Sequence, residues 1–322
     1  MILKEMIKKL KQIGIIPVAK IENPAHAIPL VGALLKGGIP CIEVTFRSDT
    51  AEEAIRKISQ ERPEVLVGAG TVLNIEQAKS ALGAGAKFLV TPGFNSKIVD
   101  FAQAEEVPIF PGVNSPTNIE AALEKRLEVL KFFPAEQSGG CEMLKAFAGP
   151  YQNVKFIPTG GIDINNLNDY LSLPNVIACG GSWLVAPKLI NSEKFKEIEE
   201  LAFKTVSTIL DFSLSHIGIN MKNKEVAMKN ASEIFKLFGF PINIGKSSIF
   251  NGKEFEWMKK PFLGRNGHIA IGTRNVEAAI AFLERRGIAF KEETRKEKND
   301  ELVAIYLDIE LGDFAFHLVK KR

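Results

Sequence analysis

The chain has 322 residues, of which 46% are hydrophobic and 25% charged, and its formal net charge is +3 at pH 7. This is the composition of a soluble globular protein long enough for two domains. The near balance of charges argues against an obligatory nucleic-acid surface, and three cysteines without a CxxC pair indicate neither a disulfide framework nor a cysteine zinc site.

Residues 1–20 are basic and amphipathic, but they lack the apolar core and the cleavage site of a secretory signal. No apolar run in the chain is long enough to cross a bilayer. We therefore expect a cytoplasmic protein with neither a membrane nor a nucleic acid as its partner.

Short apolar stretches alternate with amphipathic ones from residue 13 to about residue 189. The predicted strands cover 15–20, 41–47, 66–72, 87–93, 107–113, 128–135, 154–161 and 176–182. Strand–helix alternation implies parallel strands with right-handed crossovers, and this number of units predicts an α/β fold of the (β/α)8 TIM-barrel type. A doubly wound open sheet is the alternative, although no GxGxxG follows the first strand.

Lys131 lies in the predicted strand EVLKFFPA, among β-branched and aromatic residues. Burial disfavours the ammonium form of a lysine, and the neutral amine attacks carbonyl carbons to form a Schiff base. The alternative is a lysine at a strand end whose ammonium group reaches solvent.

Glu43, Thr45 and Arg47 share one face of the second predicted strand, because side chains alternate with a period of two. In a barrel, the carboxyl ends of the strands carry the active site. A carboxylate that points into the barrel mouth near an imine-forming lysine is suited to general acid–base catalysis. Glu43 could instead serve only as the ion-pair partner of Lys131.

Glycine pairs end the seventh and eighth predicted strands, in PTGGI (158–162) and CGGSWL (179–184). Barrels commonly bind phosphate at these two ends through backbone N–H groups, which glycine lets approach closely. Ser182 could add a hydroxyl and Arg47 a bidentate guanidinium. The pattern predicts a phosphorylated substrate.

The motifs IEVTFR, VGAGTVLN, VTPGFN, FPGVNSPT, KFFPAE, PTGGI and CGGSWL occur in that order along the barrel. With them, residues 1–211 resemble the 2-keto-3-deoxy-6-phosphogluconate aldolases, also known as 4-hydroxy-2-oxoglutarate aldolases. The resemblance implies that Lys131 forms the Schiff base and that Glu43 transfers protons. It further implies substrate contacts at Arg47, Thr71, Pro92, Phe133 and Thr159, and phosphate contacts at Gly160, Gly161, Gly181 and Ser182.

The implied reaction is a class I aldol cleavage that needs no cofactor and releases pyruvate from a phosphorylated 2-keto sugar acid or from 4-hydroxy-2-oxoglutarate. A homotrimer is expected from the same resemblance. The first predicted strand ends in Lys20, a departure from the family's usual arginine. A non-catalytic phosphate-binding barrel is the alternative reading.

Residues 212–322 do not continue the strand–helix alternation of the preceding segment, and they contain a repeat. Each copy opens on His-Ile-x-Ile, at His216 and at His268, and continues through a predicted helix into strand-rich sequence that ends in KEFEWMK or DFAFHLV. Two βαβββ modules in an α+β domain are similar to the glyoxalase, or vicinal oxygen chelate, superfamily. We therefore expect domains at 1–211 and 212–322.

In that superfamily the metal ligands come from the first and last strand of each module, which correspond here to His216, Glu256, His268 and His317. Glutamate is usual at the last position, so His317 is a departure. Three imidazoles and a carboxylate suit a divalent zinc, nickel, iron or manganese ion. Glu254 is an alternative to Glu256, and the histidines could instead cap strands without binding a metal. The domain would then be a metal-dependent isomerase or lyase, or a non-catalytic module.

Overall fold

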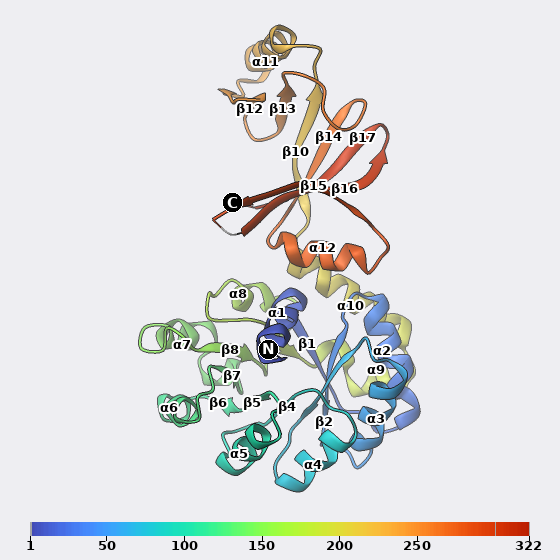
Figure 1. Cartoon of the computed structure of the whole chain (residues 1–322), viewed down its shortest axis with the longest axis vertical. Coiled ribbons are helices and arrows are strands. Elements are labelled where there is room, and N and C mark those ends of the chain that lie inside the picture. Colours follow the sequence, from blue (N-terminus) through green and yellow to red (C-terminus); the bar gives the residue numbers. More distant parts are fainter. Residues whose placement is uncertain (1, 300, 322) are drawn as a thin grey trace. The chain divides into compact units, whose positions relative to one another are not determined.

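The computed structural model describes residues 2–299 and 301–321. The chain divides into two compact units, Met1–Ile209 and Leu210–Arg322 (Figure 1). Within the described residues, no helix combines the length and the apolar character that a membrane span requires.

The N-terminal unit is built from short parallel strands. They are β1 (Ile15–Ala19), β2 (Cys41–Thr45), β3 (Leu66–Gly70), β4 (Leu89–Val90), β5 (Ile109–Phe110), β6 (Gly112–Val113), β7 (Val129–Phe132), β8 (Lys155–Pro158) and β9 (Cys179–Gly181). One sheet has the order β5-β4-β3-β2-β1-β9 and another has the order β6-β7-β8. Parallel bridges also join Phe156 to Val176 and Thr159 to Gly180, between the β8 and β9 segments. This α/β arrangement is consistent with the predicted barrel.

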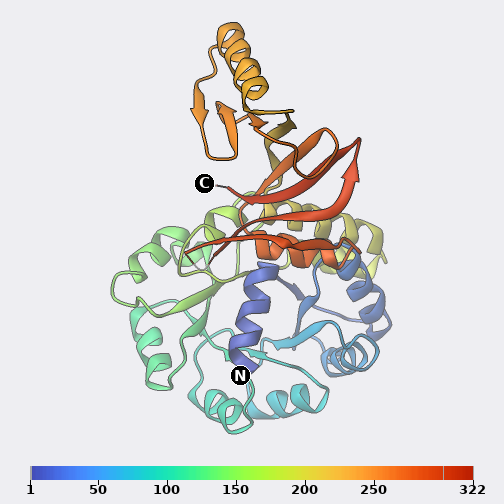
Figure 2. The same cartoon turned by 45° about the horizontal axis from the view of Figure 1, so that its top comes forward.

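Helices follow most of these strands and surround them (Figure 2). They are α1 (Ile2–Ile13), η1 (Pro24–His26), α2 (Ala27–Lys36), α3 (Ala51–Glu61), α4 (Ile75–Gly83), α5 (Ser96–Ala104), α6 (Pro116–Glu124), η2 (Glu136–Ser138), α7 (Gly140–Phe147), α8 (Leu167–Leu171), η3 (Trp183–Val185), α9 (Pro187–Asn191) and α10 (Phe195–Leu210). Asn74, Asn95 and Ser115 begin α4, α5 and α6, because their side-chain oxygens accept backbone N–H groups of the first turn.

One predicted strand differs from the observed elements in more than its end residues. The predicted strand 107–113 is divided into β5 and β6 at Pro111, which has no N–H to donate to a ladder. Helix α10 begins at Phe195, after Glu193, whose φ of 54° lies in the left-handed region that a helix cannot continue through.

The C-terminal unit has the element order β10 (Ser213–Asn220), α11 (Lys224–Phe238), β11 (Ile242–Ile244), β12 (Ser248–Asn251), β13 (Phe255–Met258), β14 (Gly267–Thr273), α12 (Val276–Glu284), β15 (Phe290–Lys298), β16 (Glu301–Leu311) and β17 (Phe314–Lys320). Its sheet has the order β11-β12-β13-β10-β14-β17-β16-β15. β10 pairs in parallel with β13, β14 pairs in parallel with β17, and β10 and β14 are antiparallel neighbours. The first and last strands of each βαβββ run therefore lie side by side at the centre of the sheet.

Candidate active site and histidine cluster

Lys131 and Glu43 meet inside the N-terminal unit, although 88 positions separate them in the sequence. Lys131 lies on β7 and is 5% exposed, and Glu43 lies on β2 and is 3% exposed. The Lys131 Nζ atom is 3.4 Å from Glu43 Oε1. A buried amine is thus held beside a buried carboxylate, which is the arrangement required for a nucleophile served by a proton-transfer group.

Gly70 provides the space that the Glu43 carboxylate occupies. Gly70 is the last residue of β3 and pairs with Thr45 of β2. A Cβ atom at Gly70 would lie 2.0 Å from Glu43 Oε1 and 2.6 Å from Glu43 Cδ, well inside van der Waals contact. Glycine at position 70, the second glycine of the VGAGTVLN motif, is therefore required by the Glu43 side chain on the neighbouring strand.

We expect Gly70→Ala to lower kcat by about 10²-fold, because the methyl group displaces the Glu43 carboxylate from Lys131 and a misplacement of about 1 Å can cost that much. Steady-state rates of pyruvate release measure this. Gly83→Ala is the matched control, because a Cβ atom there meets nothing within 4 Å. Equal activity of the two variants would contradict the proposed packing around Glu43.

Thr45 connects Arg47 to the first strand. Its Oγ1 atom donates to the carbonyl of Ala19 at 3.0 Å and accepts from Arg47 Nε at 3.2 Å. Within the described residues, Arg47 forms no ion pair, so its charge is available to an anionic ligand. Lys20, at the end of β1, instead pairs with Glu22 at 2.6 Å.

The other predicted substrate residues lie at the carboxyl ends of their strands. The Phe133 ring centroid is 5.2 Å from Lys131 Nζ. Thr159 follows β8, and its side chain fills the space left by Gly180, where a Cβ atom would be 2.2 Å from Thr159 Oγ1. Thr71 follows β3 with a φ of 54°, an unfavourable conformation of the kind found at functional sites. Pro92 follows β4, and within the described residues no hydrogen bond joins Lys131 to Thr71 or Pro92.

The predicted phosphate residues lie on two adjacent turns. Gly160 and Gly161 follow β8 with φ values of 102° and 75°, which only glycine adopts readily. Gly181 ends β9, and Ser182 precedes the short helix η3. A Cβ atom at Gly181 would lie 2.0 Å from the Trp183 ring, so the indole packs directly against this turn.

The C-terminal unit brings its predicted ligands into one cluster. Ring nitrogens of His216, His268 and His317 all lie within 4.8 Å of one another. Glu256 Oε2 is 3.2 Å from His216 Nε2 and 3.0 Å from His268 Nε2. Glu254 is exposed and accepts from the backbone N–H of Lys253, so Glu256 is the carboxylate that faces the histidines.

Within the described residues, three buried ring nitrogens of this cluster have no hydrogen-bond partner. They are Nδ1 of His268 and both Nδ1 and Nε2 of His317. Buried polar atoms are nearly always paired, so unpaired ones at a convergence of ligating side chains require an explanation. Gly218 of β10 makes room for the His268 ring, because a Cβ atom there would lie 2.1 Å from His268 Cε1.

Protonation states in the cluster favour cation binding. Burial, together with the neighbouring His268 and His216, lowers the pKa of His317 to about 3, so that its ring is neutral at pH 7. Burial alone would raise the pKa of Glu256, but hydrogen bonds from His216, His268 and Ser248 hold that pKa well below the usual carboxyl range. Neutral imidazole and ionised carboxylate are the forms that bind metal ions.

Sequence reasoning assigned no role in these sites to Thr45, Gly70 or Gly218. Thr45 acts on Arg47, two residues along the chain. Gly70 acts on Glu43 and Gly218 on His268, each from a neighbouring strand. For Thr45, the predicted strand face that it shares with Glu43 and Arg47 already carried the signal. For the two glycines, only the strand register carries the signal.

Comparison with known proteins points to one family for the N-terminal unit. The family model described as KDPG and KHG aldolase matches residues 6–201. The chain is 47% identical over 206 residues to the 2-dehydro-3-deoxy-phosphogluconate aldolase of Haemophilus influenzae, a match covering 64% of this chain and 97% of that protein.

Solved structures agree with this. A KDPG aldolase from Legionella pneumophila, with pyruvate captured as a covalent carbinolamine intermediate, is 40% identical with a TM-score of 0.59; the match covers 60% of this chain and 93% of that one. The 2-keto-3-deoxy-6-phosphogluconate aldolase of Zymomonas mobilis with 3-phosphoglycerate is 37% identical with a TM-score of 0.57, covering 62% of this chain and 94% of that one.

Proposed function

Because the chain belongs to the KDPG and KHG aldolase family, we propose that its N-terminal unit is a class I aldolase that forms a Schiff base with its substrate. It cleaves 2-keto-3-deoxy-6-phosphogluconate to pyruvate and glyceraldehyde 3-phosphate, and 4-hydroxy-2-oxoglutarate to pyruvate and glyoxylate. The observation that carries this proposal is the buried Lys131–Glu43 pair, 3.4 Å apart, in the unit that matches the family. The unit is proposed to be a complete (β/α)8 barrel.

In the proposed mechanism, Lys131 Nζ attacks the C2 ketone and Glu43 donates the proton with which the carbinolamine oxygen leaves as water. The resulting iminium is an electron sink. Loss of the proton from the C4 hydroxyl to Glu43 breaks the C3–C4 bond, whose electron pair forms the enamine of pyruvate, and the aldehyde leaves. The enamine then takes a proton at C3, and water hydrolyses the iminium to release pyruvate and the free lysine.

Substrate positioning is assigned to the surrounding strand ends. Arg47 and the turns at Gly160–Gly161 and Gly181–Ser182 are proposed to hold the anionic groups of the substrate. Thr71, Pro92, Phe133 and Thr159 would line the reacting carbon chain. The two substrates share the 2-keto acid end that meets Lys131 and differ at the far end, which is where the anion-binding turns act.

A homotrimer stays a prediction, which native mass spectrometry would test.

Pyruvate release measures the proposed activity. Each of the two substrates is incubated with the chain, and pyruvate is followed by its reduction to lactate. We expect turnover of both substrates, because the same C3–C4 bond is broken in each. No pyruvate from either substrate would contradict the proposal.

We further propose that the C-terminal unit, a glyoxalase-like pair of βαβββ modules, holds a divalent metal ion. His216, Glu256, His268 and His317 would hold it, and such an ion would supply Lewis-acid polarisation of a bound oxygen. The convergence of ligating atoms and the unpaired ring nitrogens of His268 and His317 favour this proposal. It makes a metal-dependent isomerase or lyase the second candidate function of the chain.

Metal content of the tag-free chain, measured by mass spectrometry after dialysis, tests the cluster. We expect about one zinc, nickel, iron or manganese ion per chain, and His317→Ala should lower the affinity by at least about tenfold, since second-shell changes alone cost that much. His26→Ala is the control, because His26 lies in η1 of the other unit. Equal metal content in all three proteins, or none in any, would contradict the assignment.

A further inference from the structure

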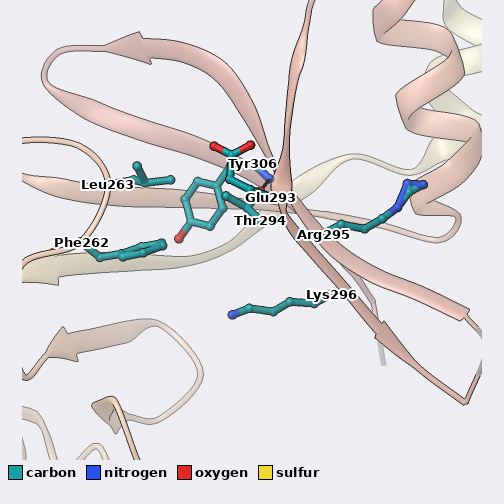
Figure 3. Close-up of a pocket in the computed structure, with 7 residues that line it drawn as sticks. All are labelled: Phe262, Leu263, Glu293, Thr294, Arg295, Lys296 and Tyr306. Carbon is teal, nitrogen blue, oxygen red and sulfur yellow. Dashed lines mark hydrogen bonds between the residues drawn. The ribbon is translucent and has the colours of Figure 1, made fainter.

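The structure assigns to the C-terminal unit a second feature, a pocket that we propose binds a small organic carboxylate with an apolar substituent. The pocket has a volume of about 340 Å³ and is lined by residues 262–263 and by parts of β15 and β16 (Figure 3). This is the low end of the about 300–1,000 Å³ range of small-molecule sites. The proposal requires neither the aldolase activity nor a bound metal.

The Tyr306 side chain lines this pocket and also contacts the histidine cluster. Its ring stacks on His317, with centroids 4.4 Å apart and an interplanar angle of 10°. The Phe262 ring meets Tyr306 edge-on at 5.8 Å. A ligand against Tyr306 would therefore lie next to the proposed metal ligands, separated from His317 by one aromatic ring.

Two hydrogen-bond donors in the pocket have no partner within the described residues. One is the ammonium group of Lys296, whose side chain extends beneath Phe262 and Tyr306 in Figure 3. By contrast, Lys291 and Lys320 each pair with a carboxylate. The other donor is the Tyr306 hydroxyl, which lies at the end of the ring that lines the pocket.

The remaining polar side chains of the pocket are already occupied or lie elsewhere. Arg295 points away from the aromatic rings and approaches Glu292 and Glu297, each at 3.7 Å. The Thr294 hydroxyl donates to the carbonyl of Lys291 and accepts from the backbone N–H of Tyr306. The Glu293 carboxylate lies on the opposite side of Tyr306 from Lys296 in Figure 3, so an anion would bind on the Lys296 side.

These observations define the ligand. Two donors, one of them charged, match the two oxygens of a carboxylate, whereas a phosphate dianion presents three oxygens to be satisfied. Phe262 is 53% exposed, an unusual state for a large aromatic side chain that lines a pocket. A flat or branched apolar group on the carboxylate would cover that ring and the edge of Tyr306.

Isothermal titration of the full chain with 3-phenyllactate tests the proposal, because this probe has the carboxylate and the aromatic group but no ketone that could form an imine at Lys131. We expect Lys296→Met to weaken binding about 10- to 100-fold, as the loss of a hydrogen bond to a charged group does. Arg295→Gln, the matched control, should change the affinity less than about twofold, since this side chain is turned away. Tyr306→Phe should weaken binding while keeping the stacking on His317.

Two further ligands test whether the pocket requires a negative charge and whether it prefers a carboxylate to a phosphate. The neutral amide of phenyllactate should bind much more weakly, and phenyl phosphate should not bind more tightly than the carboxylate. The same titrations on chain stripped of metal distinguish a failure of this proposal from a failure of the metal proposal. Binding through Lys296 and Tyr306 should not depend on an ion at the histidine cluster. Absence of phenyllactate binding, or an affinity that Lys296→Met and Arg295→Gln change equally, would overturn the proposal. Tighter binding of phenyl phosphate would overturn the choice of carboxylate.

Discussion

Lys131→Ala is expected to lower kcat for both aldol cleavages by at least about 10⁴-fold, because no other group can replace a covalent nucleophile. The reason lies in the geometry of the site, where Lys131 Nζ is 3.4 Å from the carboxylate proposed to serve it. Steady-state pyruvate release measures the loss. Retention of the wild-type kcat would remove Lys131 from the mechanism.

Lys131→Ala also removes the partner of a buried carboxylate, which can cost about 3–5 kcal/mol of folding free energy. Lys131→Arg is therefore the informative companion variant. It keeps a positive charge next to Glu43 but cannot form the imine, so it should be as inactive as the alanine variant. Chemical denaturation followed by circular dichroism should show that Lys131→Arg remains folded. An active Lys131→Arg protein would mean that charge alone suffices.

Glu43→Gln is expected to lower kcat by about 10²- to 10⁴-fold, the usual contribution of a general acid–base group. Glutamine keeps the shape of the side chain and the hydrogen bond with Lys131 but cannot exchange protons. Pyruvate binding, measured by titration, should change much less than kcat. A loss in kcat that is much larger than the loss in pyruvate affinity would indicate that Glu43 transfers protons rather than supports the fold.

Glu43→Asp serves as the control for this variant, because it keeps the carboxyl group and shortens its reach. It should recover part of the activity that Glu43→Gln loses. A Glu43→Gln protein that loses pyruvate affinity and kcat by the same factor would instead indicate that Glu43 only pairs with Lys131 and maintains the packing near Gly70.

The catalytic side chains of the aldolase site could be predicted from the sequence, but the packing around them could not. The period of two placed Glu43, Thr45 and Arg47 on one strand face, and the family motifs identified Lys131. No pattern in the sequence gives the space between β2 and β3, so the need for glycine at position 70 became visible only with Glu43 in place. The interruption at Pro111 was readable in principle, since proline cannot pair within a ladder.

In the C-terminal unit, the repeat located the histidines because each copy opens on the same motif. The choice between Glu254 and Glu256 depended on strand register, which pairs Glu256 with Gly218 on β10. The pocket beside Tyr306 could not be predicted, because Phe262 comes from a loop and Lys296 from a strand whose pairing is irregular. Such juxtapositions depend on local bulges that leave little trace in the sequence.

Borohydride reduction in the presence of pyruvate, followed by intact-mass and peptide mapping, tests the central claim most directly. The proposed mechanism predicts one pyruvate adduct, located on Lys131, in samples with and without EDTA. An adduct that EDTA leaves unchanged would establish the Schiff-base mechanism independently of the histidine cluster. No adduct on any lysine would contradict the class I mechanism and direct attention to His216, Glu256, His268 and His317.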